Sequence, residues 1–510
     1  MRNKLSNLIL KEFHFLKNIT TLKDSIVCSI EINEGFIVPY NTFYDTVLRK
    51  TKNYKDEFAI NNEEESLLLL HFNDLNKLIG HLCLKLDQNK NQILFNNINI
   101  SHNQSNVIES VIDWANNLFL IDDITLPEND IKTIIGFSKK NNVGDKMILT
   151  AGPSIGVREK TYSADATVNG WNNQWNKYLS QFEKEFAEYI GVKYAIATSS
   201  CTGAMHIALS ALDIKKGDEV IVPDITWVST ANAVMLVGAT PIFADVDLDT
   251  WTIDPKSVES LINEKTKAIM PVHLYGHPAK MDEIMSLAKK YNLKIIEDAA
   301  PSIGAEFNEQ KTGSFGDFSA FSFQGAKLLV TGEGGMLCTN DEDLYKRAFK
   351  IWDQGRVPGT FWIEELSSKY KMANIQAAIG LGQLQRNDLM VNKKRTINEW
   401  YYSRLKDVKG IRFFKESQFV KSICWMSCIL LGEESNITRD EFCKKLKDLN
   451  VDTRPVFPTI SQYPYWIKKQ KEQPISKFIS DRAINLPSGV CLSQNEINYV
   501  CDQIIKILGE

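Results

Sequence analysis

Short apolar runs rich in β-branched residues recur through the middle of the chain, with amphipathic segments of helical length between them. Continuous apolar runs of this length are typical of strands buried on both faces. We expect strands over Tyr194–Thr198, Glu219–Pro223, Pro241–Asp245, Ala268–Val272, Lys294–Glu297, Phe318–Ser322 and Gly335–Thr339. We expect helices over Gly203–Leu212, Thr230–Val237, Pro255–Glu264 and Met281–Tyr291. This alternation predicts an α/β fold, with a mostly parallel seven-stranded sheet covered by helices on both faces.

The pattern differs on either side of this region. The first 145 residues are rich in Asn, Lys, Ile and Leu and predict a small α+β domain. We expect an amphipathic segment there at Leu5–Phe15, a strand near Ser25–Ile32, and helices near Glu63–Leu84 and Val107–Phe119. Further along, a long helix over Ile375–Arg404 leads into a smaller α+β segment. The chain therefore divides into expected domains at residues 1–145, 148–390 and 391–510.

Composition narrows the classes of partner. The 510 residues carry a net charge of −4, so no basic excess points to nucleic acid or a membrane surface. No apolar window reaches the ~18 residues of a membrane span, and Lys11 interrupts the apolar start of the chain. Nine scattered cysteines do not form a disulfide framework, and His273 and His277 flank Gly276 rather than share a helix face. We expect a cytoplasmic protein with no metal site.

Two residues suggest chemistry at the strand ends. Asp298 closes the apolar strand KIIED, where a carboxylate can pair with a pyridinium nitrogen, although a helix-capping Asp is the simpler interpretation. Lys327 follows the strand Phe318–Ser322 in FSFQGAKLLVTGEGG. A lysine in a partly dry cleft can attack an aldehyde, although most lysines are solvated surface groups.

Three further features lie at other strand ends. The segment TSSCTGAMH, residues 198–206, joins a strand to a helix start that favours an anion, and Thr202 and Gly203 lie in it. An ordinary N-cap would look similar. Ser322 can add a hydroxyl to the same phosphate, and Trp227 can stack on a planar ring, although such a residue is more often core. Taken together, these groups are what pyridoxal 5′-phosphate (PLP) needs.

The ordered motifs resemble a known family. Residues from roughly 150 to 510 are similar to the DegT/DnrJ/EryC1/StrS sugar aminotransferases, in particular to nucleotide-sugar 4-aminotransferases. The matching segments include GPSIG, ATSSCTGAMHIALSAL, GDEVIVPDITWVST, IIEDAAPSIGA, TGSFGDFSAFSF, KLLVTGEGGML, YKMANIQAAIGLGQL and RPVFP. The resemblance implies a PLP-dependent enzyme of fold type I, acting as a homodimer with active sites at the subunit interface. The first 145 residues lie outside it.

The resemblance also implies residue roles. Lys327 would bind the cofactor covalently, and Asp298 would pair with its ring nitrogen. Thr202, Gly203 and Ser322 would hold the phosphate, and Trp227 would cover the ring. Asn374 would lie near the shared active site, and Arg454 would lie near cofactor and substrate.

Two positions depart from the family pattern. Pro301 stands where the family has Gln or Glu, and Asp353-Gln354-Gly355-Arg356 replaces Asn-His-Gly-Arg. These departures put substrate choice in doubt rather than cofactor binding. Relatives that act as dehydratases carry His in place of the lysine, so Lys327 argues against that branch.

The expected reaction moves an amino group from L-glutamate to a nucleotide-linked 4-keto-6-deoxy sugar. The product would be a 4-amino-4,6-dideoxy sugar nucleotide for polysaccharide biosynthesis. The alternatives are a PLP-dependent sugar 3-aminotransferase, a dehydratase, or a non-catalytic regulatory homologue.

Overall fold

The computed structural model describes residues 143–144, 146–416, 419–466 and 471–509, and the backbone of six strands between residues 16 and 125. The chain divides into two compact units, one of residues 1–142 with 155–161 and the other of residues 143–154 with 162–510. Each unit is described by itself. Among the described helices, none combines the length and apolar character needed to cross a membrane.

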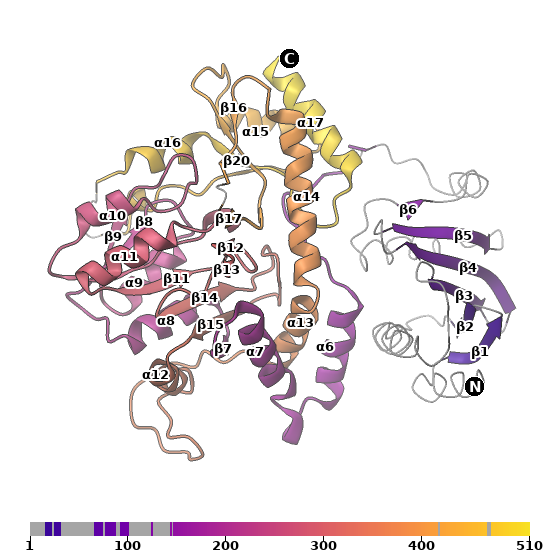
Figure 1. Cartoon of the computed structure of the whole chain (residues 1–510), viewed down its shortest axis with the longest axis horizontal. Coiled ribbons are helices and arrows are strands. Elements are labelled where there is room, and N and C mark those ends of the chain that lie inside the picture. Colours follow the sequence, from indigo (N-terminus) through magenta and orange to yellow (C-terminus); the bar gives the residue numbers. More distant parts are fainter. Residues whose placement is uncertain are drawn as a thin grey trace. The chain divides into compact units, whose positions relative to one another are not determined.

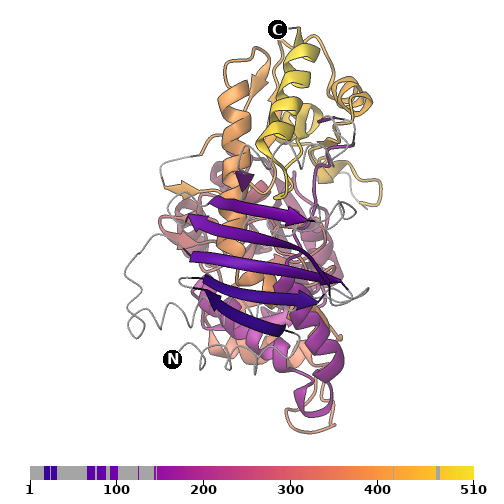
Figure 2. The ribbon, with the colours of Figure 1, turned by 90° about the vertical axis from the view of Figure 1, so that its right-hand side faces the viewer.

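The six described strands of the first unit form one sheet in the order β1-β2-β3-β4-β5-β6 (Figure 2). The pairs β2–β3 and β5–β6 are parallel, and the remaining neighbours are antiparallel. Their bounds are Leu16–Leu22, Ser25–Glu31, Ser66–Asp74, Lys77–Asp87, Gln92–Ile100 and Ile124–Thr125.

The helix expected near Glu63–Leu84 is wrong, because strands β3 and β4 occupy that stretch as an antiparallel pair. The alternation Leu82-Cys83-Leu84-Lys85-Leu86 has the two-residue period of a strand, and this local signal outweighs the helical interpretation. The expected strand near Ser25–Ile32 is β2. The amphipathic segment expected at Leu5–Phe15 and the helix expected near Val107–Phe119 lie outside the described residues.

The second unit is built on a seven-stranded sheet in the order β7-β15-β14-β11-β10-β8-β9 (Figure 1). All of its strands run parallel except β15, which is antiparallel to both neighbours. The bounds are β7 Tyr194–Thr198, β8 Glu219–Pro223, β9 Thr240–Ala244, β10 Thr266–Ile269, β11 Lys294–Asp298, β14 Phe318–Ser322 and β15 Gly335–Thr339. The mostly parallel seven-stranded sheet expected from the sequence is confirmed.

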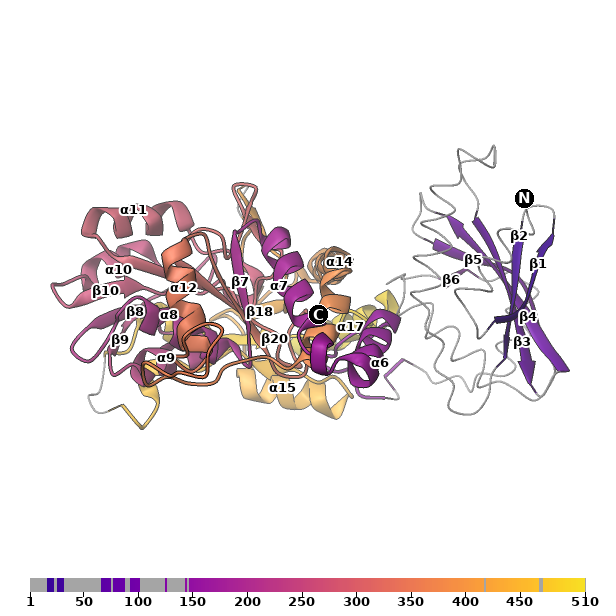
Figure 3. The same ribbon diagram turned by 90° about the horizontal axis from the view of Figure 1, so that it is seen from below.

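Helices cover both faces of this sheet. Helices α10 (Pro255–Leu261) and α11 (Met281–Tyr291) lie on one face, and α8 (Cys201–Ala211) and α9 (Ser229–Leu236) lie on the other (Figure 3). The apolar core beneath α10 and α11 combines side chains from these helices, such as Met281, with side chains from strands β8, β10 and β11. Helices α7 (Lys177–Ile190) and α12 (Glu342–Trp352) complete this part. Helix α6 (Val157–Asn169) has its first residues in the first unit and the rest in the second.

The last third of the chain contains a second, smaller sheet. Helix α14 (Asn387–Leu405) runs into it and packs against α17 (Gln494–Leu508). The four strands have the order β16-β18-β20-β19 and are antiparallel. The bounds are β16 Ile411–Arg412, β18 Cys428–Leu431, α15 Arg439–Asp448, β19 Arg454–Pro455, α16 Pro474–Arg482 and β20 Ala483–Asn485. A separate apolar core, which includes Tyr401, Phe442 and Ile484, lies between this sheet and its helices.

A third, three-stranded sheet in the order β13-β12-β17 connects the two parts. Its bounds are β12 Glu306–Phe307, β13 Gln310–Lys311 and β17 Val420–Lys421.

The single long helix expected over Ile375–Arg404 is wrong, because the structure has two helices there. Helix α13 (Asn374–Leu384) ends before Arg386, and α14 begins at Asn387. The break is held by tertiary contacts, since the buried guanidinium of Arg386 donates to Ser154 and Gln383 donates to the Ser154 carbonyl. Sequence periodicity alone does not report such contacts.

Candidate active site

The candidate residues meet where three parallel strands end. Strands β7, β11 and β14 run parallel, so Thr198, Asp298 and Ser322 lie at the same edge of the sheet. The antiparallel strand β15 begins with Gly335, which pairs with Ser322 on one side and with Thr198 on the other. Register therefore places the start of helix α8 beside the end of β14.

The start of α8 has the features of an anion site. Ser200 caps the helix and accepts a hydrogen bond of 3.0 Å from the N–H of Gly203. The N–H groups of Cys201 and Thr202 belong to the first turn, where a helix supplies no backbone acceptor and the dipole favours an anion. A Cβ added at Gly335 would lie 2.6 Å from the Cys201 nitrogen. Strand β15 can therefore approach this turn closely only because residue 335 is glycine.

Asp298 is a buried carboxylate with fixed donors. The Thr230 hydroxyl, in the first turn of α9, donates to Oδ2 of Asp298 at 2.7 Å, and the N–H of Ala300 donates to Oδ1 at 3.2 Å. Burial raises the pKa of Asp298, while these two hydrogen bonds and the charge of Lys327 oppose the rise. The pKa of Asp298 therefore stays above its usual value, and the hydrogen bonds and Lys327 offset part of the cost of burying its charged form.

Lys327 lies in the loop between β14 and β15, which is held by backbone hydrogen bonds and by buried Leu328, Leu329 and Val330. Burial lowers the pKa of the Lys327 amine, and the negative charge of Asp298 opposes that shift. Its Nζ lies 3.9 Å from the ring centroid of Trp425. A partly desolvated amine of this kind reaches its neutral, nucleophilic form more readily than an exposed lysine.

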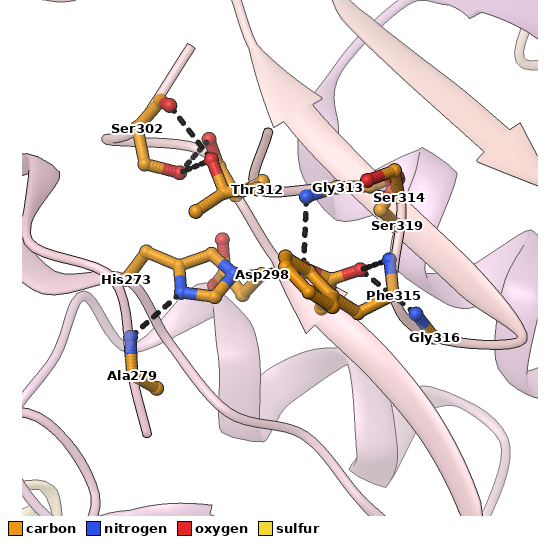
Figure 4. Close-up of polar contacts among 12 residues, drawn as sticks. His273, Ala279, Asp298, Ser302, Thr312, Gly313, Ser314, Phe315, Gly316 and Ser319 are labelled. Carbon is orange, nitrogen blue, oxygen red and sulfur yellow. Dashed lines mark hydrogen bonds and ion pairs between the residues drawn. The ribbon is translucent and has the colours of Figure 1, made fainter. Parts of the chain in front are cut away.

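A buried histidine–carboxylate pair lies behind Asp298. The N–H of Ala279 donates to Nδ1 of His273 at 3.0 Å, so the ring proton is on Nε2, which faces Glu297 Oε2 at 3.0 Å. Glu297 also accepts three N–H groups from the turn before β14, those of Gly313, Phe315 and Gly316. Figure 4 labels these three donor residues. This network ties the ends of β10 and β11 to the strand that leads to Lys327.

Trp227 lies near the same edge but remains 58% exposed. It precedes α9, and its ring centroid is 5.8 Å from that of Phe457. Ser322 is half-buried at the end of β14, and within the described part of the chain its side-chain hydroxyl has one hydrogen bond, a long one of 3.5 Å from the N–H of Gln324. Both side chains therefore have faces or atoms left to contact a ligand.

The structure places the other two expected residues differently. Asn374 accepts hydrogen bonds from the N–H groups of Tyr178 and Leu179, at 3.0 and 3.3 Å, and so caps the start of α7. Arg454 is exposed, and its guanidinium lies 3.7 Å from Asp452. Neither one contacts Lys327 or Asp298 among the described interactions, and their expected roles stay predictions.

The two departures from the family pattern have local structural roles. Pro301 is buried in the turn that follows Asp298. Asp353 forms ion pairs with Arg356 and Lys371, and Gln354 has a φ of +66° in the turn beside it. Lys371 in turn forms a β-bridge with Thr198, so this ion pair lies next to the end of β7.

These residues fit PLP. The first turn of α8 can bind a phosphate, and the buried Asp298 can pair with a protonated ring nitrogen. The amine of Lys327 can react with an aldehyde. The carboxylate, the amine and the Cys201 thiol are close enough for their charges to influence one another. Sequence patterns missed Thr230 and Trp425, because a threonine in a helix and a tryptophan in a loop carry no functional signature by themselves.

The fold and this set of groups define a PLP-dependent aminotransferase of fold type I. A model of the DegT/DnrJ/EryC1/StrS aminotransferase family matches residues 153–505, and the chain belongs to this family.

Similar sequences and a similar solved structure support the same family. The chain is 41% identical to GDP-perosamine synthase of Escherichia coli O157:H7, over 72% of this chain and 100% of that protein. It is 39% identical to GDP-perosamine synthase of Caulobacter vibrioides, over 71% of this chain and 98% of that protein. The aminotransferase TlmJ from Streptoalloteichus hindustanus has a similar structure, with a TM-score of 0.67 and 27% identity over 71% of this chain and 98% of that one.

Proposed function

We propose that this enzyme transfers the amino group of L-glutamate to the C4 ketone of a nucleotide-linked 4-keto-6-deoxy sugar. The product is the 4-amino-4,6-dideoxy sugar nucleotide. The observation that carries the proposal is the meeting of Lys327, Asp298 and the first turn of α8 at one sheet edge. The similarity to GDP-perosamine synthases supports the sugar acceptor and favours a GDP-linked one.

Each group has a task in this proposal. PLP, when bound, supplies a ring that accepts the electron pair left when the Cα–H bond of the donor breaks. The first turn of α8 and the Ser322 hydroxyl would bind the phosphate, and Trp227 would lie against the ring. Asp298 would hold the proton on the ring nitrogen. Lys327 would bind the cofactor and, when its amine is free, would act as the base and acid that moves the proton.

We also propose that the enzyme works as a homodimer. The loop between α12 and α13 exposes Phe361, Trp362, Ile363 and Leu366 to an unusual degree, with Phe361 97% and Leu366 102% exposed. Adjacent exposed apolar side chains mark interaction surfaces. Charged substitution of Phe361 and Leu366 together is expected to shift the protein toward monomer in sedimentation velocity. A dimer that persists would place the interface elsewhere. The cytoplasmic location stays a prediction.

The test follows both halves of the reaction. Purified protein with PLP is expected to show the visible absorption band of the lysine-bound cofactor, and L-glutamate is expected to bleach it. Folded Lys327→Ala is expected to lack that band. The glutamate-treated enzyme is then given, in separate assays, a GDP- or dTDP-linked 4-keto-6-deoxy sugar and the corresponding 3-keto sugar, and each product is analysed by NMR.

An amine at C4 supports the proposal. An amine at C3, formed from a 3-keto sugar only, would instead indicate a 3-aminotransferase. Deoxygenation without amine would indicate a dehydratase. Wild-type protein without a band at saturating PLP would favour a non-catalytic homologue.

A further inference from the structure

Trp425 lies in the loop between β17 and β18, in the last third of the chain, yet it contacts the loop that carries Lys327. Its indole Nε1–H donates to the carbonyl of Ala326 at 3.0 Å. Ala326 immediately precedes Lys327, so this bond fixes the backbone from which the reactive side chain extends. Trp425 therefore links two segments about a hundred residues apart in the sequence.

The position of Trp425 is itself fixed from several sides. Its N–H donates to the carbonyl of Tyr275 at 2.9 Å, and its carbonyl accepts from the buried side-chain Nζ of Lys394 at 2.7 Å. Its ring stacks on that of Tyr275, with centroids 5.9 Å apart and an angle of 22°. Tyr275 also stacks on Phe457, with centroids 5.6 Å apart and an angle of 12°. A ring held in this way cannot turn to follow a moving side chain.

The face of this ring is occupied by the Lys327 ammonium, with Nζ 3.9 Å from the centroid. Tryptophan is the aromatic residue that attracts a cation most strongly, and the attraction grows when water is excluded. The titratable groups that act on Lys327 from other elements are the Asp298 carboxyl at the end of β11 and the Cys201 thiol at the start of α8, and burial raises the pKa of that thiol well above its usual value. Trp425 adds a neutral, fixed contact from the C-terminal part of the chain.

We propose that Trp425 is a positioning residue that holds the free amine of Lys327 over its indole ring whenever the lysine is not bonded to the cofactor. The proposal rests on Lys327 being the reactive lysine of the proposed function. During each half-reaction the amine must leave, act as base and acid, and return. A defined resting place keeps it near Asp298 and favours its charged form at the stage when it carries the proton.

The test measures Lys327 in the cofactor-free protein. Trace acetylation at a series of pH values, read by mass spectrometry of the Lys327 peptide, gives the pH midpoint of amine reactivity. Trp425→Leu keeps an apolar side chain but removes the ring, so the midpoint is expected to fall by about one pH unit. Trp425→Phe keeps a weaker aromatic face and is expected to give a smaller fall. The Phe variant carries the test alone if the Leu variant does not fold.

Trp352→Phe is the matched control. Trp352 is also a buried indole that donates to a backbone carbonyl, that of Ala197, and carries a lysine, Lys371, 4.5 Å from its ring centroid. Trp352→Phe removes a comparable set of contacts without touching Lys327. The pH midpoint of Lys327 reactivity is therefore expected to stay at the wild-type value. A midpoint that is unchanged or raised in folded Trp425→Phe and Trp425→Leu overturns the proposal. So does an equal fall in the Trp352 control.

A second readout concerns the return of the amine. The rate at which the visible band grows when PLP is added to cofactor-free enzyme is expected to drop several-fold in Trp425→Leu, and kcat is expected to fall with little change in KM for glutamate. If wild type forms no band at all, the proposed function fails. The acetylation midpoints still decide whether Trp425 holds the amine, so the two failures are distinguishable.

Discussion

Thr230→Val tests whether Asp298 must stay charged to hold the cofactor. Valine has nearly the shape of threonine and fits the fully buried site, but it cannot donate to Oδ2 of Asp298. The carboxylate keeps the N–H of Ala300, whose bond is longer at 3.2 Å. The substitution therefore removes the shorter of the two donors without opening a cavity.

The magnitude follows from the type of hydrogen bond. A bond to a charged group contributes about 1.5–3 kcal/mol. If this free energy is lost entirely from the charged form of Asp298, which pairs with the ring nitrogen, PLP binds about 10- to 100-fold more weakly. The sign of the pH effect is also fixed. Removing a donor raises the pKa of Asp298 further, and binding that needs the carboxylate is lost as pH falls through that pKa. The variant should lose affinity at a higher pH than wild type does.

The assay is a PLP titration, followed by the visible band, between about pH 6 and 8. Thr230→Ser keeps the hydroxyl and is the control, with affinity expected near that of wild type. Asp298→Asn removes the charge and sets the lower limit. Folded Thr230→Val that binds PLP like wild type at every pH would refute the reasoning, because the hydroxyl would then contribute nothing to the charge of Asp298.

Three further predictions concern the frame of the site. Burial raises the pKa of Glu183 to about 7, although Ala197 N–H donates to it. Its stability contribution is present below the unfolded value of 4.5 and lost as pH rises toward 7. Urea unfolding should therefore show Glu183→Gln more stabilising at about pH 8 than at about pH 5. Asn374→Ala should lower the free energy of unfolding by ~1 kcal/mol, measured the same way, because the α7 cap is lost. Gly335→Ala should lower both the melting temperature and PLP affinity, since its Cβ would press on Cys201 N.

The second unit was largely predictable because its signals are local. All seven expected strands form the sheet, and the helix expected over Met281–Tyr291 is α11 with the same bounds. Apolar runs bounded by turn residues report a buried parallel strand directly. The break between α13 and α14 was not predictable, because it depends on the bonds of Arg386 and Gln383 to the distant Ser154. The pair β3–β4 shows the opposite failure, in which a two-residue period was present but was interpreted as a helix.

The candidate site shows the same division at the level of single side chains. Lys327 and Asp298 could be proposed from sequence because they occur together with a predicted anion site and an aromatic residue near successive strand ends, in motifs that resemble a known family. Their surroundings could not, because a donor such as Thr230 or a ring such as Trp425 becomes functional only through a partner that is distant in sequence. Groups that tune a buried charge must come from other elements, since a strand end cannot surround its own side chain. Substitution of Thr230 or Trp425 should therefore shift the pH dependence of PLP binding or of Lys327 reactivity, whereas Lys327→Ala should remove the visible band. This difference separates residues that tune the site from the residue that reacts.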